Sequence, residues 1–104
     1  MASVCWLEDR DDRLARARAL ATEDPQAALA LVETVLAEVP DDRAALAAKG
    51  AVLVDVADAE RDGVRARRLY AQALALLETH GGEGRDLEAA RRGYAATSTA
   101  RRTG

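Results

Sequence analysis

Apolar residues recur at every third or fourth position along most of this chain, which is the spacing that gathers them on one face of an α-helix. The breaks between these segments are too short to join anything but antiparallel neighbours, so the helices should pair as hairpins. Residues 1–9 have no clear periodicity, and residues 98–104 are expected to form a flexible basic tail. The predicted helices cover roughly residues 11–21, 25–39, 42–59, 64–79 and 86–97.

The first two breaks contain residues that begin and end helices. Asp24 is a suitable N-cap, and Pro25 stands at the first helical position, where a proline is best tolerated. Pro40 should end the second helix, because the residue before a proline is disfavoured in the α region. Asp41 or Asp42 should then cap the third helix.

The later breaks are rich in glycine. Residues 60–63 predict a turn in which the final Asp-Gly pair supplies a backbone that can reach positive φ. The glycines after His80 should stop the fourth helix, and the histidine should lie near the negative end of the helix dipole. Asp86 is expected to cap the fifth helix.

Composition supports an all-α fold of antiparallel hairpins in a single domain over residues 1–97. The 104 residues include 25 alanines, 13 leucines, two prolines and no phenylalanine. Alanine is the strongest helix former and lets helices approach closely, but each alanine buries little area. The core should therefore be built mainly from leucine and valine.

The second and fourth helices carry a similar pattern of small and large residues, 38 positions apart. Ala66, Tyr70 and Ala73 follow an Ala-x3-Tyr-x2-Ala pattern, and Ala28 begins a copy with valines at the other two positions and a stop at Pro40. The pattern resembles the second helix of the tetratricopeptide repeat, a helix–turn–helix unit of about 34 residues. The resemblance implies about two repeats and a C-terminal capping helix, stacked as a short five-helix solenoid. An ordinary antiparallel bundle is the alternative.

A glycine in the middle of the third helix supports the same resemblance. Inside a helix, glycine costs about 1 kcal/mol relative to alanine, so Gly50 needs a packing reason. In the tetratricopeptide family, a glycine at this place lets the paired helix approach closely, and Leu46 and Leu53 flank Gly50 as that pattern implies. Leu87 and Tyr94 have the corresponding spacing in the fifth helix, as in a capping helix.

The charge distribution argues against nucleic acid as a partner. Residues 84–104 carry five arginines and two acidic residues, an excess of +3, so the remainder of a chain of net charge −3 carries −6. An acidic body lacks the basic footprint that phosphate binding needs. The chain also has no apolar run of membrane-spanning length and no signal-peptide pattern, which predicts a cytoplasmic protein that does not bind membranes.

No set of residues predicts catalysis, a cofactor or a metal site. Cys5 and His80 are the only residues of their types, which leaves no internal disulfide and too few partners for zinc or a Cys–His nucleophile. The glycines of residues 81–84 precede no lysine and follow no strand, so they do not predict a phosphate loop. The acidic cluster at residues 9–12 is expected to act at a helix N-terminus.

The resemblance implies a module that binds another protein and has no small-molecule substrate. Proteins of this family bind peptides or helices on the concave face made by the first helix of each pair. A floor of alanines flanked by arginines would suit an apolar segment with acidic ends, although the same arginines could form an ordinary solvated face. The partner-binding residues implied at those positions are Arg10, Arg13, Ala17, Ala47, Ala51, Asp55, Arg85 and Arg92.

Two other roles stay open from the sequence. Two repeats leave one end of the stack uncovered, so the chain could self-associate as a homodimer, with Trp6 in the interface. It could also serve as an accessory subunit or chaperone of a larger assembly. A homodimer would melt at a temperature that depends on protein concentration, whereas a monomeric peptide binder would not.

Overall fold

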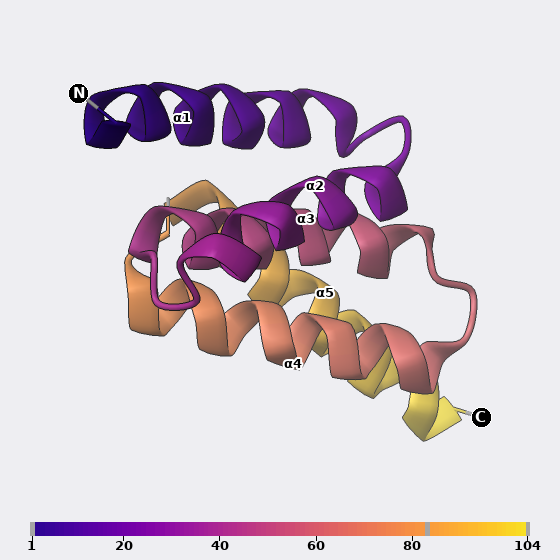
Figure 1. Ribbon diagram of the computed structural model, residues 1–104. Helices are drawn as coiled ribbons and strands as arrows, with labels where there is room; N and C mark the ends of the chain where they lie inside the picture. The colour runs from indigo at the N-terminus through magenta and orange to yellow at the C-terminus, as the bar shows by residue number, and fades with distance from the viewer. Residues whose placement is uncertain (1, 83, 104) are drawn as a thin grey trace.

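The chain folds into five α-helices over the residues that the structure describes. The structure is a computed structural model, and it describes the backbone of residues 2–82 and 84–103 and the side chains of residues 9–82 and 84–97. The helices are α1 (Ala2–Leu20), α2 (Pro25–Glu38), α3 (Arg43–Ala59), α4 (Gly63–His80) and α5 (Gly84–Thr103). The all-α class and the order of five helices predicted from the sequence are confirmed (Figure 1).

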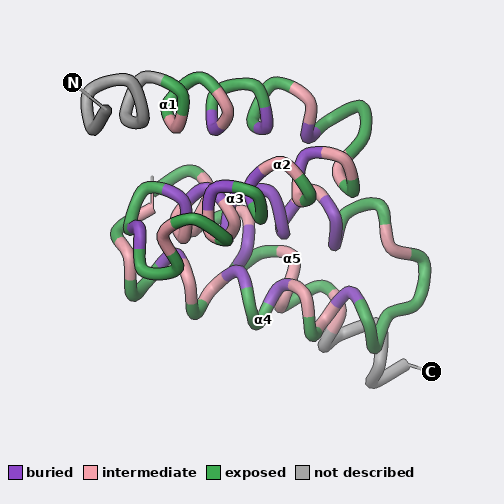
Figure 2. The backbone as a smooth tube through the Cα atoms, in the orientation of Figure 1, coloured by how far each residue is buried: buried purple, intermediate pink, exposed green. Residues whose placement is uncertain are grey.

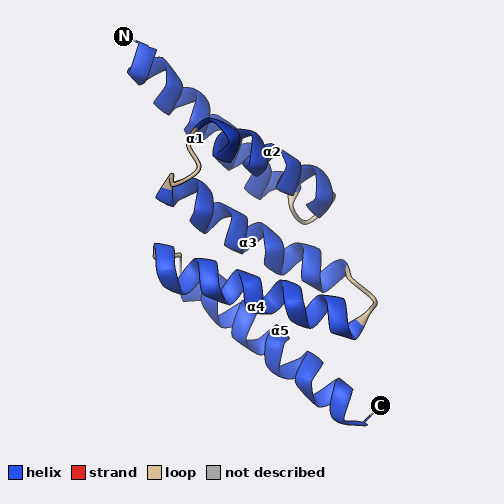
Figure 3. Ribbon diagram, turned by 60° about the horizontal axis from the view of Figure 1, so that its bottom comes forward, coloured by secondary structure: helices blue, strands red, loops and turns tan. Residues whose placement is uncertain are grey.

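Consecutive helices run antiparallel and form an elongated stack with α3 at its centre. Contacts join α3 to each of the other four helices, and Figure 3 shows α3 between the α1–α2 hairpin and the α4–α5 pair. The molecule measures 56 by 25 by 21 Å. Because α1 contacts α3 and α3 contacts α5, the first helices of successive hairpins are neighbours in the stack.

Two apolar clusters lie on opposite sides of α3. One joins α1, α2 and α3 and includes Leu14, Val32 and Val35, and the other joins α3, α4 and α5 and includes Leu53 and Leu77. Buried positions therefore run almost without interruption through the second half of α3 (Figure 2). A helix covered on two sides must be apolar around most of its circumference, which explains the dense alanine and valine content of this segment.

The helix caps predicted in the first two breaks are confirmed. The Asp24 side chain accepts a hydrogen bond of 3.1 Å from the N–H of Ala27, at the start of α2. The Asp42 side chain accepts one of 3.0 Å from the N–H of Ala44, at the start of α3. The end of α2 just before Pro40 is also as predicted. Each cap satisfies an N–H group that has no partner inside its helix.

The glycines after His80 end α4 as the sequence predicts. Gly81 has a φ of 72°, in the left-handed region that glycine adopts without strain. The N–H groups of Gly81 and Gly82 both donate to the carbonyl oxygen of Leu77 at 3.1 Å. These bonds satisfy a carbonyl group of the last turn, and His80 lies in that turn, at the negative end of the helix dipole.

Gly63 differs from its prediction. It belongs to the predicted turn at residues 60–63 but does not use the positive φ that glycine can reach, which among the described glycines occurs at Gly81. Gly63 is instead the first residue of α4, and Asp62 caps the helix by accepting from the N–H groups of Val64 at 2.9 Å and Arg65 at 3.4 Å. Aspartate followed by glycine suits a turn and a helix start equally well, because its short side chain accepts from nearby N–H groups in both.

The first helix begins earlier than predicted. α1 starts at Ala2 and not near residue 11, so the acidic cluster at residues 9–12 lies within the helix, and its prediction as an N-terminal cap is wrong. The periodicity of apolar residues reveals only the helical turns that pack against a neighbour. Ion pairs between residues one turn apart stabilise a helix without producing that periodicity. Asp9 and Arg13 form such a pair at 2.7 Å.

The last helix extends beyond its predicted end. The backbone of α5 is helical to Thr103, so most of the segment predicted as a tail, residues 98–104, continues the helix. The side chains of this segment lie outside the described residues, as do those of Cys5 and Trp6.

The helix contact predicted at Gly50 is confirmed. A Cβ atom at this position would lie 2.9 Å from Cγ of Leu77 and 3.2 Å from Cβ of Leu76, so α4 crosses α3 where no side chain intervenes. Tyr70 is buried with 6% of its surface exposed. The alanines of the repeat pattern are also buried: Ala28, Ala66 and Ala73.

A second close contact, between α4 and α5, was not predicted. A Cβ atom at Gly93 would lie 2.2 Å from Cε1 of Tyr70, so the tyrosine ring packs directly against the glycine backbone. Both contacts have the same cause: a helix can approach at this distance only where its neighbour carries no side chain.

Candidate functional site

The first helices of the hairpins share one face, on which side chains of α1 and α5 meet. Arg18 of α1 forms an ion pair of 3.0 Å with Asp86 of α5, and both charges act on Asp55 of α3. The arrangement makes α1, α3 and α5 neighbours on a common surface, which we call the α1–α3–α5 face. It is the surface to which the family resemblance assigns partner binding.

Asp55 is a half-buried acid on this face. Burial raises the pKa of the Asp55 carboxyl above its ordinary value, and the carboxylates of Asp58 and Asp86 raise it further, while the Arg18 guanidinium lowers it. A raised carboxyl pKa means that folding disfavours the ionised form. The Asp55 charge therefore costs stability at neutral pH.

Replacing Asp55 with asparagine should raise the melting temperature at pH 7. The neutral amide keeps the size of the side chain and removes the unfavourable charge. The difference in melting temperature between variant and wild type should become smaller as the pH falls towards 3.8, the ordinary pKa of the carboxyl group. At that pH the Asp55 carboxyl is protonated in the unfolded chain as well. Thermal melts at several pH values measure this, with Asp41→Asn as an exposed control. A gain in both variants that does not change with pH would contradict the account.

The arginines predicted on α1 make contacts within the chain. Arg10 contacts Asp42 at 3.3 Å, and Arg13 forms ion pairs with Asp9 at 2.7 Å and with Glu38 of α2. Their side chains are only 21% and 17% exposed. These two arginines connect α1 to α2 and to the start of α3, so any contact with a partner would add to interactions already present.

Some of the other predicted partner-binding residues are buried, and some are accessible to a partner. Ala17 and Ala51 are buried, with 0% and 6% of their surface exposed, whereas Ala47 is half-buried. Arg85 and Arg92 on α5 are exposed, and Arg92 lies 3.4 Å from Glu88. Of the predicted residues, Ala47, Asp55, Arg85 and Arg92 are therefore the ones that a partner could reach without disturbing the core.

Two cavities lie beside α4, and neither is lined by the predicted partner-binding residues. The larger, about 520 Å³, lies between α4 and α5 and is lined in part by Val64, Ala71, Tyr94 and Thr97. The smaller, about 320 Å³, lies where α4 meets α2 and the end of α3, and Leu29 and Val56 contribute to it. Arg68 lines both cavities and so stands on the ridge between them.

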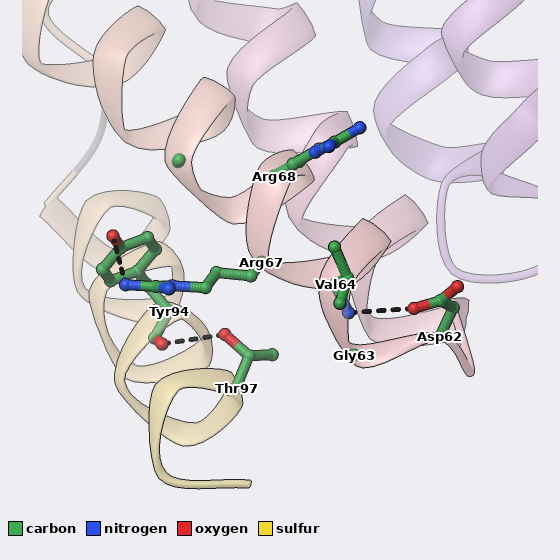
Figure 4. A pocket seen from close by; sticks show the side chains of 8 residues that line it. Asp62, Gly63, Val64, Arg67, Arg68, Tyr94 and Thr97 are labelled. Carbon is green, nitrogen blue, oxygen red and sulfur yellow. Dashed lines mark hydrogen bonds between the residues drawn. The ribbon is translucent and has the colours of Figure 1, made fainter. Parts of the chain in front are cut away.

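Arg67 and Tyr94 form one wall of the larger cavity. The guanidinium carbon of Arg67 lies 4.8 Å from the centre of the Tyr94 ring, and its Nη2 donates to the tyrosine hydroxyl at 3.0 Å. Figure 4 shows Arg67 reaching across to Tyr94 while Arg68 points away from it. Nε of Arg67 is buried without a hydrogen-bond partner, so the donors of this side chain are not all satisfied.

Arginines without an ion pair are concentrated at the start of α4. Of the thirteen arginines and lysines with described side chains, seven form ion pairs. Four of the remaining six lie in residues 61–68, and nearby carboxylates make backbone hydrogen bonds instead: Asp62 caps α4, and Glu60 accepts from the N–H of Asp62. We call the surface formed by Arg61, Val64, Arg65, Arg67 and Arg68 the basic surface of α4.

The sequence does contain a pattern that marks this surface, but a search for buried apolar positions does not find it. Val64, Arg67, Arg68 and Ala71 have the spacing i, i+3, i+4 and i+7, which places them on one stripe of α4. That stripe is separate from the buried one formed by Ala66, Tyr70, Ala73 and Leu77. Val64 is the one large apolar side chain that is strongly exposed among the described residues, at 54%.

Within the described residues, no group of three or more histidine, cysteine, aspartate or glutamate side chains is placed to hold a metal ion. The part of the chain that the structure describes also contains no helix long and apolar enough to cross a membrane. Comparison of the chain with protein-family models, with curated proteins and with solved structures gives no match.

Proposed function

We propose that the chain is a non-catalytic protein-interaction module that binds a peptide or helix of a partner protein on the α1–α3–α5 face. The observation that carries the proposal is the ion pair between Arg18 and Asp86, which brings α1 and α5 together over the α3 residue Asp55. Three helices thereby frame one surface, and Ala47, about two turns before Asp55 on α3, offers a small, half-buried side chain near it. Such an arrangement suits a segment laid along α3.

We further propose that the stack is of the tetratricopeptide kind. The close approach of α3 and α4 at Gly50 supports this, as does the burial of Ala66, Tyr70 and Ala73. The contacts of α3 with α1 and α5 are those expected when the first helices of successive repeats stack. In this proposal α5 acts as the capping helix.

The test uses exposed arginines of the face. Arg85→Glu combined with Arg92→Glu changes two exposed side chains and breaks only the exposed Arg92–Glu88 pair, so folding should stay intact. A change at Arg13 would break ion pairs with Asp9 and Glu38 that connect α1 to α2. We expect tagged wild-type protein to purify a stoichiometric partner from cells of its source organism. The double variant should retain about tenfold less of it. The partner, once purified, should raise the melting temperature of the wild type when added back.

A homodimer would give a different result. Wild-type protein would then recover only itself, its sedimentation coefficient would rise with concentration, and its melting temperature would rise in parallel. Equal recovery of a partner by wild type and double variant would place the interface outside the exposed part of the α1–α3–α5 face. Either result would overturn the proposal.

A further inference from the structure

We infer that the basic surface of α4 binds an acidic segment of a partner protein, with an apolar side chain of that segment seated in the cavity beside Val64. The surface is separate from the α1–α3–α5 face and the inference is carried by different observations. It therefore goes beyond the proposed function and does not depend on it.

The first step is charge. Four arginines lie within residues 61–68, and none of them forms an ion pair in the part of the chain that the structure describes. Elsewhere most arginines are paired, Arg13 with two carboxylates. Unpaired guanidinium groups in a chain of net charge −3 leave a local positive surface, which favours carboxylates from outside.

The second step is geometry. Arg65 and Arg68 are three residues apart on α4, which separates them by about 4.5 Å along the helix axis. An extended segment advances about 3.3 Å per residue, so two acidic side chains one or two residues apart would reach both arginines. A planar guanidinium can hold a carboxylate through two parallel hydrogen bonds, which fixes the orientation of the segment as well as its charge.

The third step is the cavity. The cavity has a volume of about 520 Å³. It is lined by Val64, the strongly exposed large apolar side chain, and by Tyr94 beside Arg67. An apolar side chain entering there would cover Val64 and remove apolar surface from water. The chemistry of the occupant is therefore an apolar residue next to acidic ones.

The same surroundings disfavour nucleic acid. Asp58, Glu60 and Asp62 adjoin the arginines in sequence, and their charges would repel a continuous phosphate backbone. Four arginines are also few for a phosphate-binding surface whose affinity comes from the number of charges neutralised. A short protein segment can place its carboxylates on the arginines and leave the acidic residues uncovered.

The experiment selects ligands from a random peptide library displayed on phage, with the full chain as bait. We expect the selected peptides to be enriched in acidic residues beside a large apolar one. A synthetic peptide of the selected sequence, labelled for fluorescence anisotropy, should lose about tenfold or more in affinity for the double variant Arg65→Glu, Arg68→Glu. Its affinity for wild type should also fall as salt is raised.

The matched control is the double variant Arg85→Glu, Arg92→Glu, which changes the net charge by the same amount on the α1–α3–α5 face. Circular dichroism melts show whether both variants are folded. If both variants lower the peptide affinity equally, the effect comes from overall charge and the inference is overturned. Selected peptides without acidic residues, or a single-stranded oligothymidine that binds more tightly than any peptide, would overturn it as well. Selected peptides without acidic residues leave the proposed function untouched, and loss of the purified partner in the Arg85→Glu, Arg92→Glu variant does not involve Arg65 or Arg68, so the two proposals fail separately.

Discussion

Replacing Gly50 with leucine should destabilise the folded protein by about 3 kcal/mol, because the new side chain has no space between α3 and α4. Even a Cβ atom would lie 2.9 Å from Cγ of Leu77 and 3.2 Å from Cβ of Leu76, and the rest of the leucine would force the helices apart. The gain in helix propensity, about 1 kcal/mol, is too small to offset this. Urea denaturation followed by circular dichroism measures the difference in unfolding free energy.

The control is the same substitution at Gly63. No heavy atom lies within 4 Å of a Cβ at that position, so Gly63→Leu should change stability by less than about 1 kcal/mol. If the two variants prove equally stable, α3 and α4 do not pack closely at Gly50, and the hairpin stack described here is wrong at its central contact.

Replacing Tyr70 with alanine should cost about 3–5 kcal/mol. The ring is buried, belongs to the apolar cluster of α3, α4 and α5, and packs against the backbone of Gly93. Removing it leaves a cavity that the surrounding helices cannot fill without moving. The measurement is again the unfolding free energy in urea.

Two further variants separate the contributions of the ring. Tyr70→Phe removes only the hydroxyl, which donates to the Asp58 carboxylate, and should cost about 1 kcal/mol. Gly93→Ala should destabilise the wild type, because its methyl group overlaps the ring, but should be tolerated in the Tyr70→Ala background. Additive effects of Gly93→Ala and Tyr70→Ala would contradict the contact.

Much of the fold follows from local chemistry that the sequence displays. The N-caps at Asp24 and Asp42 and the proline after α2 depend on neighbours a few residues away, so the residue types alone identify them. Gly50 was informative for a different reason: a glycine inside a helix is unfavourable unless a neighbouring helix needs the space. The start of α1 was missed because no comparable apolar or capping signal marks it.

The contacts between helices were harder to predict. Gly93, like Gly50, lies where a neighbouring helix approaches closely. The Tyr70 ring that packs on Gly93 belongs to α4, and only the crossing of α4 and α5 brings the two residues together. The place of Arg13 on α1 predicts contact with a partner, but it does not reveal that the antiparallel pairing of α1 and α2 brings Glu38 beside it. The cavity at Val64 likewise depends on how α5 lies against α4, which the pattern of either helix alone does not specify.

The most direct test of the proposed interaction face is photo-crosslinking from Ala47. This residue is half-buried on α3, and benzoylphenylalanine introduced there would touch a segment bound along the helix. The same group at Ala37, exposed on α2, is the control. Irradiation in cells of the source organism should join Ala47, but not Ala37, to a second protein, and Arg85→Glu with Arg92→Glu should remove the product. Cross-links from Ala47 only to further copies of the chain, or equal products from both positions, would contradict the proposed function.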